Sequence, residues 1–330
     1  MSEVRILYPS KARDLWFTVL RWFDSWAGLE YMKTDGVPKM DWLRCIPIIA
    51  VHAMCLGVIW VGTSWIAVAV AVAFYFIRMF AITGWYHRYF SHRTFKTTRA
   101  CQLAFAILGG SCAQRGPLWW AGHHRHHHIA SDTKDDVHSP AQGGFLWSHI
   151  GWFTSQTHFA PRLKSITDFA KYPELRFLDR FDILVPTIAG FAMFGFGKLL
   201  ETYAPGLGTN GPQMLIWGFF ISTVALIHGT CTINSLSHVY GSQRYDTGDD
   251  SRNNFLLALI TMGEGWHNNH HFYPASTRQG FYWWEIDMTY YCLKGMEWLG
   301  LVWDIRDVPF YVREQKNKQE VVASAQLTAG

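Results

Sequence analysis

Residues 123–128 read His-His-Arg-His-His-His, the densest group of imidazoles in a chain of 330 residues that contains 16. On an α-helix, His124, His127 and His128 would stand at i, i+3 and i+4 and would share one face. Five imidazoles in six positions are not typical of a packed core or of a solvated surface. Because neutral imidazole is a common metal ligand, this stretch predicts one half of a metal site.

Three further segments supply candidate ligands for the other half. They are His87-Arg-Tyr-Phe-Ser-His92, Asn234-x-x-x-His238 and His267-Asn-Asn-His270-His271. Residues five apart, such as His87 and His92, lie about 140° apart on an α-helix. They cannot both face one metal unless the helix ends there, or else they serve two different metals.

The four segments together offer nine His and one Asn. A single four-coordinate zinc would leave more than half of them unused. Two ions with five or six ligands fit the number better, and a nitrogen-rich site with open positions suits iron. Each segment alone could also be a metal-binding tract, interfacial packing or a single zinc half-site.

The composition indicates a membrane protein. The chain is 49% hydrophobic and only 16% charged, whereas soluble domains carry roughly 25% charged residues. Its 17 Trp and 14 Tyr are typical of the aromatic belts at membrane interfaces. A formal net charge of +4 is modest and argues against a nucleic-acid-binding protein.

Four apolar segments approach the roughly 20 residues that a transmembrane helix needs. We predict spans at about 43–61, 65–84, 182–200 and 213–233, joined in two hairpins by the turn at 62–64 and the Gly/Pro-rich loop at 201–212. Neither connection contains Lys or Arg. The positive-inside rule therefore predicts that both hairpins enter the membrane from the cytoplasmic side.

The predicted fold is an all-α membrane protein. Four transmembrane helices in two hairpins carry a cytosolic helical cap that contains the His segments. Residues 1–315 are expected to form one membrane-embedded domain, and the polar residues 316–330 a disordered tail. Both termini and the metal site are expected on the cytoplasmic side of a multi-pass protein in the lipid bilayer.

The motifs HRYFSH (87–92), HRHHH (124–128), NSLSH (234–238) and GEGWHNNHHFYP (263–274) resemble those of membrane-bound fatty acyl desaturases. The similarity is to the Δ9, stearoyl-CoA desaturase-like type, runs from about Trp42 to Asp304, and favours bacterial members. It implies two iron ions (Fe²⁺/Fe³⁺) and O₂ as co-substrate. The implied ligands are His87, His92, His124, His127, His128, His238, His267, His270 and His271, with Asn234 acting through a water molecule.

The resemblance also implies roles for residues around the metals. Asp132, Asp135 and His138 lie in a stretch, SDTKDDVHS, that would orient the ligands through hydrogen bonds. Gln114, Trp120 and Thr230 would shape the bend of a tunnel for the acyl chain, and Tyr75 would close its far end. Ordinary membrane packing remains an alternative role for each of these four residues.

Removing two hydrogens from the middle of a saturated chain offers no acidic proton and no leaving group. This chemistry therefore needs an oxidant derived from O₂ at a metal. The resemblance implies a desaturase that introduces a cis double bond, at Δ9, into a fatty acyl chain. A fatty acyl or alkane hydroxylase with similar His motifs is one alternative, and a metal transporter, which would need a polar path through the spans, is another.

The sequence leaves the acyl carrier and the electron donor open. Acyl-CoA desaturases carry Arg-Asp where this chain has Gly122-His123, and a basic pair where it has Gln156-Thr157, so the carrier is either a CoA thioester or a lipid. The chain contains no His-Pro-Gly-Gly haem motif and no Cys cluster. Electrons would come from an external partner such as a ferredoxin, rubredoxin or cytochrome b5-like protein. Arg88, Arg93 and Arg125 are candidate docking charges, and ordinary solvated surface is the alternative for them.

Overall fold

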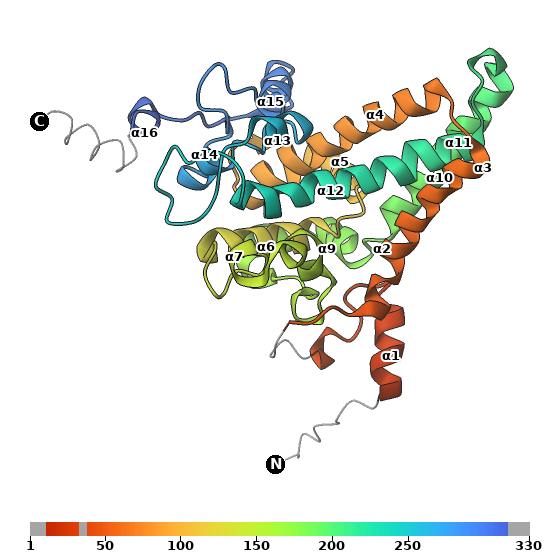
Figure 1. Cartoon of the computed structure of the whole chain (residues 1–330), viewed down its shortest axis with the longest axis horizontal. Helices are drawn as coiled ribbons and strands as arrows, with labels where there is room; N and C mark the ends of the chain where they lie inside the picture. Colours follow the sequence, from red (N-terminus) through yellow and green to blue (C-terminus); the bar gives the residue numbers. More distant parts are fainter. Residues whose placement is uncertain (1–10, 33–37, 316–330) are drawn as a thin grey trace, which may run out of the picture.

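A computed structural model describes residues 11–32 and 38–315 and shows a helical protein with two regions (Figure 1). Long helices extend to one side, and shorter helices and loops form a cap at their other end. The described residues contain one small sheet, in which β1 (Lys96–Thr97) pairs antiparallel with β2 (Val302–Trp303). The predicted all-α class is confirmed, while the predicted tail, 316–330, lies outside the described residues.

Four helices are long and apolar enough to cross a membrane, as predicted. The first, Trp42–Val61, is built from α2 (Trp42–Met54), η2 (Cys55–Gly57) and α3 (Val58–Val61). The second, Trp65–Ser91, is built from α4 (Trp65–Phe80) and the π-helix η3 (Ala81–Ser91). The third is α10 (Leu184–Tyr203). The fourth, Gly211–His238, is built from α11 (Gly211–Gln213), η9 (Met214–Ile221), α12 (Ser222–Ser235) and η10 (Leu236–His238).

The second and fourth helices continue beyond their predicted ends at 84 and 233. They reach Ser91 and His238, so each carries its His motif directly out of the membrane-spanning part. The turn between the first two spans follows the predicted signal. Gly62 adopts a φ of 68°, and the Ser64 side chain accepts a hydrogen bond from the Ala67 amide and caps α4.

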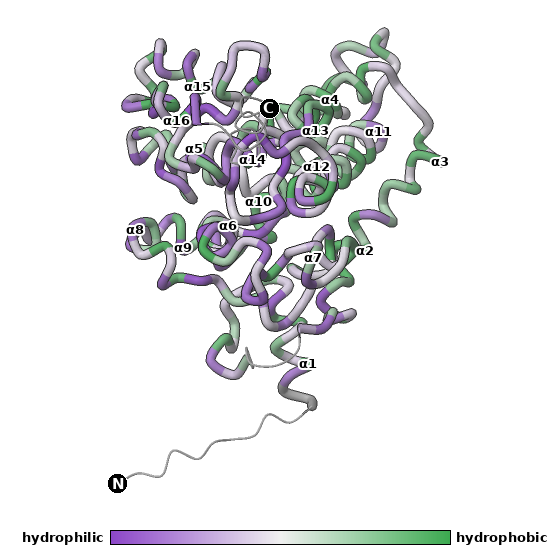
Figure 2. The backbone as a smooth tube through the Cα atoms, turned by 60° about the vertical axis from the view of Figure 1, so that its left-hand side comes forward, coloured by the Kyte–Doolittle hydropathy of each residue, from purple (hydrophilic) through white to green (hydrophobic). Residues whose placement is uncertain are grey.

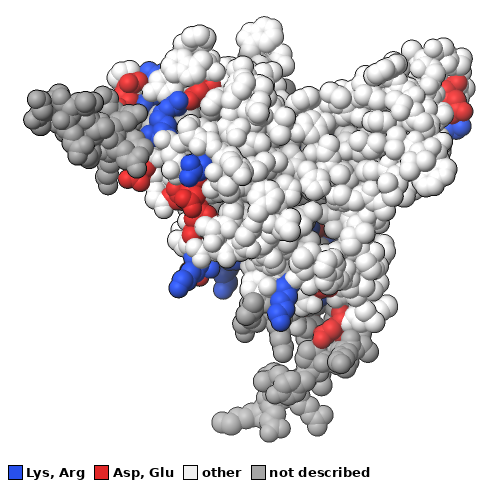
Figure 3. Space-filling model, in the orientation of Figure 1, with Lys and Arg blue, Asp and Glu red and all other residues white. Residues whose placement is uncertain are grey.

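The surface matches a protein embedded in a bilayer. Hydrophobic residues follow α3, α4 and α12, whereas hydrophilic residues gather around α14 (His267–Phe272) in the cap (Figure 2). On the face shown in Figure 3, charged side chains lie on the cap and at the far tip of the helical arm, and the surface between them is uncharged. An uncharged belt of this kind avoids the cost of placing charges in lipid. The chain is a membrane protein.

The cap and the connections consist of short elements. Before the first span lie α1 (Lys11–Leu20) and η1 (Leu29–Tyr31), and η8 (Pro205–Leu207) joins the last two spans. Between the hairpins lie α5 (Arg99–Gly110), α6 (Pro117–Ala130), α7 (Pro140–Gly143), η4 (Trp147–Gly151), η5 (Trp152–Thr154), η6 (Gln156–His158), η7 (Leu163–Ile166), α8 (Thr167–Ala170) and α9 (Pro173–Arg180). After the fourth span come α13 (Phe255–Ile260), α14, α15 (Met288–Trp298) and α16 (Phe310–Arg313).

The core of the cap forms around η3. Trp85 is fully buried and stacks on Phe105 of α5 with 4.2 Å between ring centroids. The neighbouring residues Tyr86 and Phe90 are also fully buried, and α6 packs along the same helix. Because large aromatic rings dominate the energetics of burial, η3 anchors the cap to the membrane helices.

Arg88 holds a second part of the cap against η3. Its side chain is 1% exposed, and its guanidinium donates to Glu264 Oε1 at 3.0 Å and to Asp287 Oδ1 at 2.9 Å. It also donates to the carbonyl of Thr277 at 2.8 Å. This burial shows that the interpretation of Arg88 as a docking charge is wrong, since the side chain does not reach the surface.

We predict that Arg88→Met lowers the free energy of unfolding by about 3–5 kcal/mol, because it leaves two buried carboxylates without their cation. Thermal unfolding in detergent measures the change. The matched control is Lys96→Met, which removes an exposed ion pair with Asp304 and should change the free energy by no more than about 1 kcal/mol. Equal melting temperatures for Arg88→Met and the control would contradict the structural role of Arg88.

Candidate metal centre

Five imidazoles form the first cluster, from η3 and the residue directly after it, from α6 and from α14. Their ligand nitrogens all lie within 4.8 Å of one another. His270 of α14 occupies a central position, with its Nε2 3.0 Å from that of His87 and 2.9 Å from that of His128. The complete set is His87, His92, His124, His128 and His270.

The π-helical conformation of η3 brings His87 and His92 to the same cluster. The His92 amide donates to the His87 carbonyl at 3.2 Å, the i to i+5 hydrogen bond of a π-helix. Residues linked in this way lie above one another, as residues four apart do in an α-helix. The two Nε2 atoms are therefore 3.2 Å apart. The helix also ends at Ser91, with His92 as its C-cap, so the condition under which both residues can face one site is met.

Four imidazoles form the second cluster, also within 4.8 Å of one another. His238 ends the fourth span, and its Nε2 lies 3.1 Å from that of His267. The complete set is His127, His238, His267 and His271. The two clusters together contain all nine predicted His residues, whereas Asn234 lies one turn before His238 and lines a cavity described below.

Carboxylates bind the outward-facing nitrogen of a His in each cluster. Glu264 Oε2 lies 2.5 Å from Nδ1 of His87, and Asp249 Oδ2 lies 2.6 Å from Nδ1 of His271. An imidazole that donates its Nδ1–H outward presents the lone pair of Nε2 inward. This arrangement fixes both the ring orientation and the tautomer needed for metal binding.

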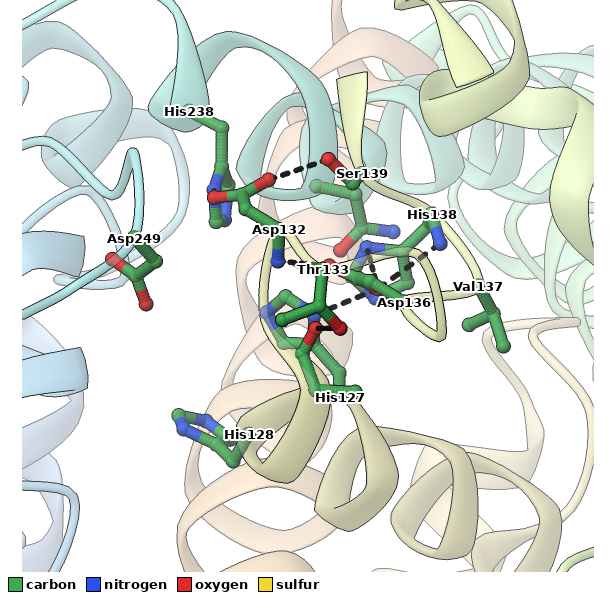
Figure 4. A network of polar contacts seen from close by, with 12 residues as sticks. His127, His128, Asp132, Thr133, Asp136, Val137, His138, Ser139, His238 and Asp249 are labelled. Atoms are coloured by element: carbon green, nitrogen blue, oxygen red, sulfur yellow. Dashed lines mark hydrogen bonds and ion pairs between the residues drawn. The ribbon is translucent and has the colours of Figure 1, made fainter. Parts of the chain in front are cut away.

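The loop after α6 supplies two more carboxylates (Figure 4). Asp132 Oδ2 lies 2.8 Å from Nδ1 of His238, and Asp136 Oδ2 lies 3.1 Å from Nδ1 of His127. The prediction for Asp135 is wrong, because its side chain is exposed and Asp136 occupies the buried position beside the ligand. His138 also packs there, with its ring centroid 4.2 Å from that of His127.

The pKa shifts indicate that the His ligands are neutral and that their carboxylate partners are ionised. Burial lowers the pKa of His271 to about 4. For Asp249, burial alone would raise the pKa, but the charge and hydrogen bond of His271, together with hydrogen bonds from Ser251 and Thr247, hold the pKa below its usual range. For Asp132, burial would likewise raise the pKa, but the charge and hydrogen bond of His238, with hydrogen bonds from Ser139 and the Asp250 amide, lower it to about 2.

The nitrogens facing the centre of each cluster fit a cation. Burial and the neighbouring imidazoles lower the pKa values of His124, His128 and His270 well below the usual range, so these rings are neutral. Nε2 of His271 is buried and has no hydrogen-bond partner among the described residues. Converging lone pairs repel one another unless a cation accepts them, so the donor set of each cluster could hold a metal ion.

A cavity of about 750 Å³ reaches the metal centre. His124 and Asn234 line it, and its apolar wall includes Phe191, Phe194 and Phe219 from the spans. A cavity that combines ligands of a metal with apolar side chains of membrane helices is suited to a long hydrocarbon chain.

Three of the four predicted tunnel residues line this cavity. Gln114 Nε2 donates to Thr230 Oγ1 at 3.0 Å, and Trp120 stacks on the ring of His124 at 5.1 Å between centroids. Tyr75 does not line it, because its hydroxyl donates to the Ile260 carbonyl at 2.8 Å. The expectation that Tyr75 closes the far end therefore does not hold for this cavity.

Comparison with known proteins identifies the family. Residues 63–298 match the family model described as fatty acid desaturase, which covers most of the chain. The chain belongs to the fatty acid desaturase family. It is therefore an oxidoreductase, and the metal centre and the cavity are the expected parts of a desaturase.

The similarity between this desaturase and its curated relatives extends over most of both chains. The sn-1 stearoyl-lipid 9-desaturase of Anabaena variabilis is 34% identical over 83% of this chain and 96% of that protein. The acyl-CoA 5-desaturase AL21 of Anemone leveillei is 35% identical over 86% of this chain and 87% of that protein. Delta-9 acyl-lipid desaturase 1 of Arabidopsis thaliana is 34% identical over 81% and 84%. The names of these relatives include both CoA and lipid as the acyl carrier, so sequence identity alone does not show which carrier this chain uses.

Sequence reasoning missed three carboxylates of this desaturase: Asp136, Asp249 and Glu264. Glu264 lies three residues before His267 within the quoted GEGWHNNHH motif, so its proximity was a usable signal. Asp249 lies in a loop far from any His motif, and only the folded chain brings it to His271. For Asp136 the signal was ambiguous, because Asp135 is its direct neighbour.

We predict that His270→Ala makes the first cluster release its metal to a chelator while the second cluster keeps its own. His270 contacts two other ligands of the first cluster, so its loss opens that site. Metal content after dialysis should fall to about one ion per chain, measured by elemental mass spectrometry. His126→Ala is the matched control from the same His tract, since among the described residues His126 bonds to the Asp135 carbonyl and belongs to neither cluster. Equal metal retention in both variants would remove His270 from the ligand set.

We predict that Asp249→Asn weakens metal binding at the second cluster by roughly 10–100-fold, because the neutral amide holds His271 less firmly. Competition with a chromogenic chelator measures the affinity. Asp250→Asn is the control, since the Asp250 side chain is exposed while its amide bonds to Asp132. If the two variants release metal alike, Asp249 has no role in orienting the ligand.

Proposed function

We propose that this desaturase introduces a cis double bond at Δ9 into the acyl chain of a membrane lipid, with two iron ions and O₂. The observation that supports this most strongly is the pair of clusters of converging imidazoles beside a cavity with apolar walls. Nitrogen-rich sites with open positions suit iron. When bound, the two irons supply the O₂-activating redox chemistry that side chains cannot provide.

The proposed reaction balances with an external electron donor. The acyl chain loses two hydrogens, and these combine with O₂, two electrons and two protons to give two water molecules. The donor would be a ferredoxin, rubredoxin or cytochrome b5-like protein. Of the three candidate docking charges, Arg93 is the most exposed, with 64% of its side chain accessible, and both Arg93 and Arg125 pair with Asp168.

The role we propose for the chain's own residues is to hold one C–C bond at the metal centre. Gln114 and Thr230, joined by a hydrogen bond, link the loop before α6 to α12 at the cavity wall. Trp120 contacts both the cavity and the ligand His124. A chain packed against this indole would be placed relative to the metal, which is the positioning that fast oxidation requires.

A lipid carrier is favoured over CoA by the positions that would hold CoA phosphates. Gly122 packs against Arg162, where a Cβ would meet the Arg162 carbonyl at 3.0 Å, and His123 bonds to the Ala160 carbonyl. Gln156 donates to the Asp41 carboxylate. These positions therefore offer no cation to a phosphate, and two of the relatives described above are named as lipid desaturases.

The proposed orientation places both termini and the metal centre in the cytoplasm. The two connections at the far ends of the hairpins contain no Lys or Arg, whereas the cap carries most of them. The positive-inside rule supports this orientation. It also places Arg93, the most exposed candidate docking charge, on the side where soluble electron donors are present.

We predict that expression in a desaturase-deficient host produces Δ9 cis-unsaturated acyl chains in membrane lipids. Gas chromatography and mass spectrometry of derivatised acyl chains report the position of the double bond and the lipid class. His270→Ala should abolish the product, and His126→Ala should retain it. A hydroxylated acyl chain as the main product would instead support the hydroxylase alternative.

A further inference from the structure

The cavity of this desaturase has a cationic end as well as an apolar wall. Three guanidinium groups line it: Arg21, Arg44 and Arg115. Arg21 donates to the carbonyls of Ala27 and Gly28, and Arg115 pairs with Asp182 at 2.7 Å. Two of the three cations therefore have their partners within the protein.

Arg44 differs because most of its donors have no partner. Its side chain is 7% exposed, and Nε lies 3.5 Å from Asp41 Oδ2. Nη1 and Nη2, which carry most of the five N–H donors of an arginine, are buried without a hydrogen-bond partner among the described residues. Burial of unsatisfied charged donors is strongly unfavourable, so this arrangement points to a ligand that completes it.

The surroundings of Arg44 leave the guanidinium available to an anion. The Cζ atom of Arg44 lies 3.5 Å from the ring centroid of Phe159. The guanidinium is therefore held by its contact with this ring rather than by hydrogen bonds from its N–H groups. The nearest carboxylate, Asp41, contacts only Nε. The two remaining nitrogens form the fork that binds phosphate or carboxylate oxygens in pairs.

The position of Arg44 matches the polar end of a lipid. It lies in the first turn of α2, and Val51, roughly 10 Å further along the same helix, also lines the cavity. Phe191 of α10 lines the cavity as well and is 75% exposed on a membrane-spanning helix. The cavity therefore opens toward the bilayer, with its cation near the membrane interface and its apolar wall deeper.

We propose that Arg44 binds the phosphodiester of a membrane glycerophospholipid whose acyl chain occupies the cavity. This rests on the proposed function, because it assigns the cavity to the acyl substrate, and it narrows the substrate to lipids with an anionic headgroup. A stearate carboxylate or inorganic phosphate offers similar oxygens. The phospholipid is favoured because the cavity opens to the bilayer and joins this cation to the metal centre.

The test measures lipid binding by the full-length protein in detergent, without an electron donor. The probes are distearoyl phosphatidylglycerol and a distearoyl monogalactosyldiacylglycerol, which share acyl chains and differ in charge. Native mass spectrometry reports the affinity for each. We expect Arg44→Gln to weaken phosphatidylglycerol binding at least about tenfold, the loss of a charged hydrogen bond, with galactolipid binding unchanged.

Two controls separate this site from general electrostatics and from a structural role. Lys39→Gln removes an exposed charge just before α2 and should leave both affinities unchanged. Arg44→Gln should melt no lower than the wild type, because the lost guanidinium is largely unpaired. Equal losses of phosphatidylglycerol binding in both variants, or a lower melting temperature with an unchanged lipid preference, would overturn the proposal.

Further measurements test which anion binds Arg44. They also separate a failure of the Arg44 site from a failure of the proposed reaction. Displacement of phosphatidylglycerol by millimolar inorganic phosphate or by stearate, at equal affinity, would overturn the phospholipid assignment. Wild-type protein that desaturates lipids but binds both probes equally would reject only the Arg44 site. Protein that binds phosphatidylglycerol through Arg44 but makes no double bond in cells would support the site and reject the proposed reaction.

Discussion

The structure depends on imidazole lone pairs that face one another in a buried space. Neutral rings in this arrangement repel, and they cannot satisfy each other by hydrogen bonds once their Nδ1–H groups point outward. The carboxylates of Glu264, Asp249, Asp132 and Asp136 impose this orientation from outside. Four buried carboxylates of the surrounding cap therefore orient the ligands, which is the arrangement expected around metal-bound histidines.

This constraint explains the local backbone of the elements that carry the ligands. On α6, His128 lies about 40° from His124 around the helix axis, while His127 lies about 60° to the other side. One helix therefore serves both clusters, with His127 turned toward the second. His87 and His92 instead serve a single cluster, which an α-helix could not achieve. The π-helix η3 provides that geometry without interrupting the helix that leaves the membrane.

Local signals in the sequence were sufficient for the spans and the His motifs, because hydrophobic length and residue type determine them. They were insufficient where the outcome depends on tertiary contacts. Asp135 and Asp136 have the same side chain, and only the conformation of the loop decides which one reaches His127. Tyr75 fits a tunnel by its position in the second span, yet a hydrogen bond to Ile260 directs it elsewhere.

The buried arginines distinguish structural from functional charge in this fold. Arg78, within the second span, is fully buried and donates to Ser222, Thr223 and the Ser111 carbonyl, so its charge is matched by the protein. The Arg44 side chain is 7% exposed, and its outer nitrogens have no hydrogen-bond partner among the described residues beside the cavity. A chain that can surround one membrane arginine with acceptors could do the same for another. The unmatched donors of Arg44 therefore belong to a surface that a ligand completes, and its position on the wall that leads to the metal centre identifies that ligand with the substrate.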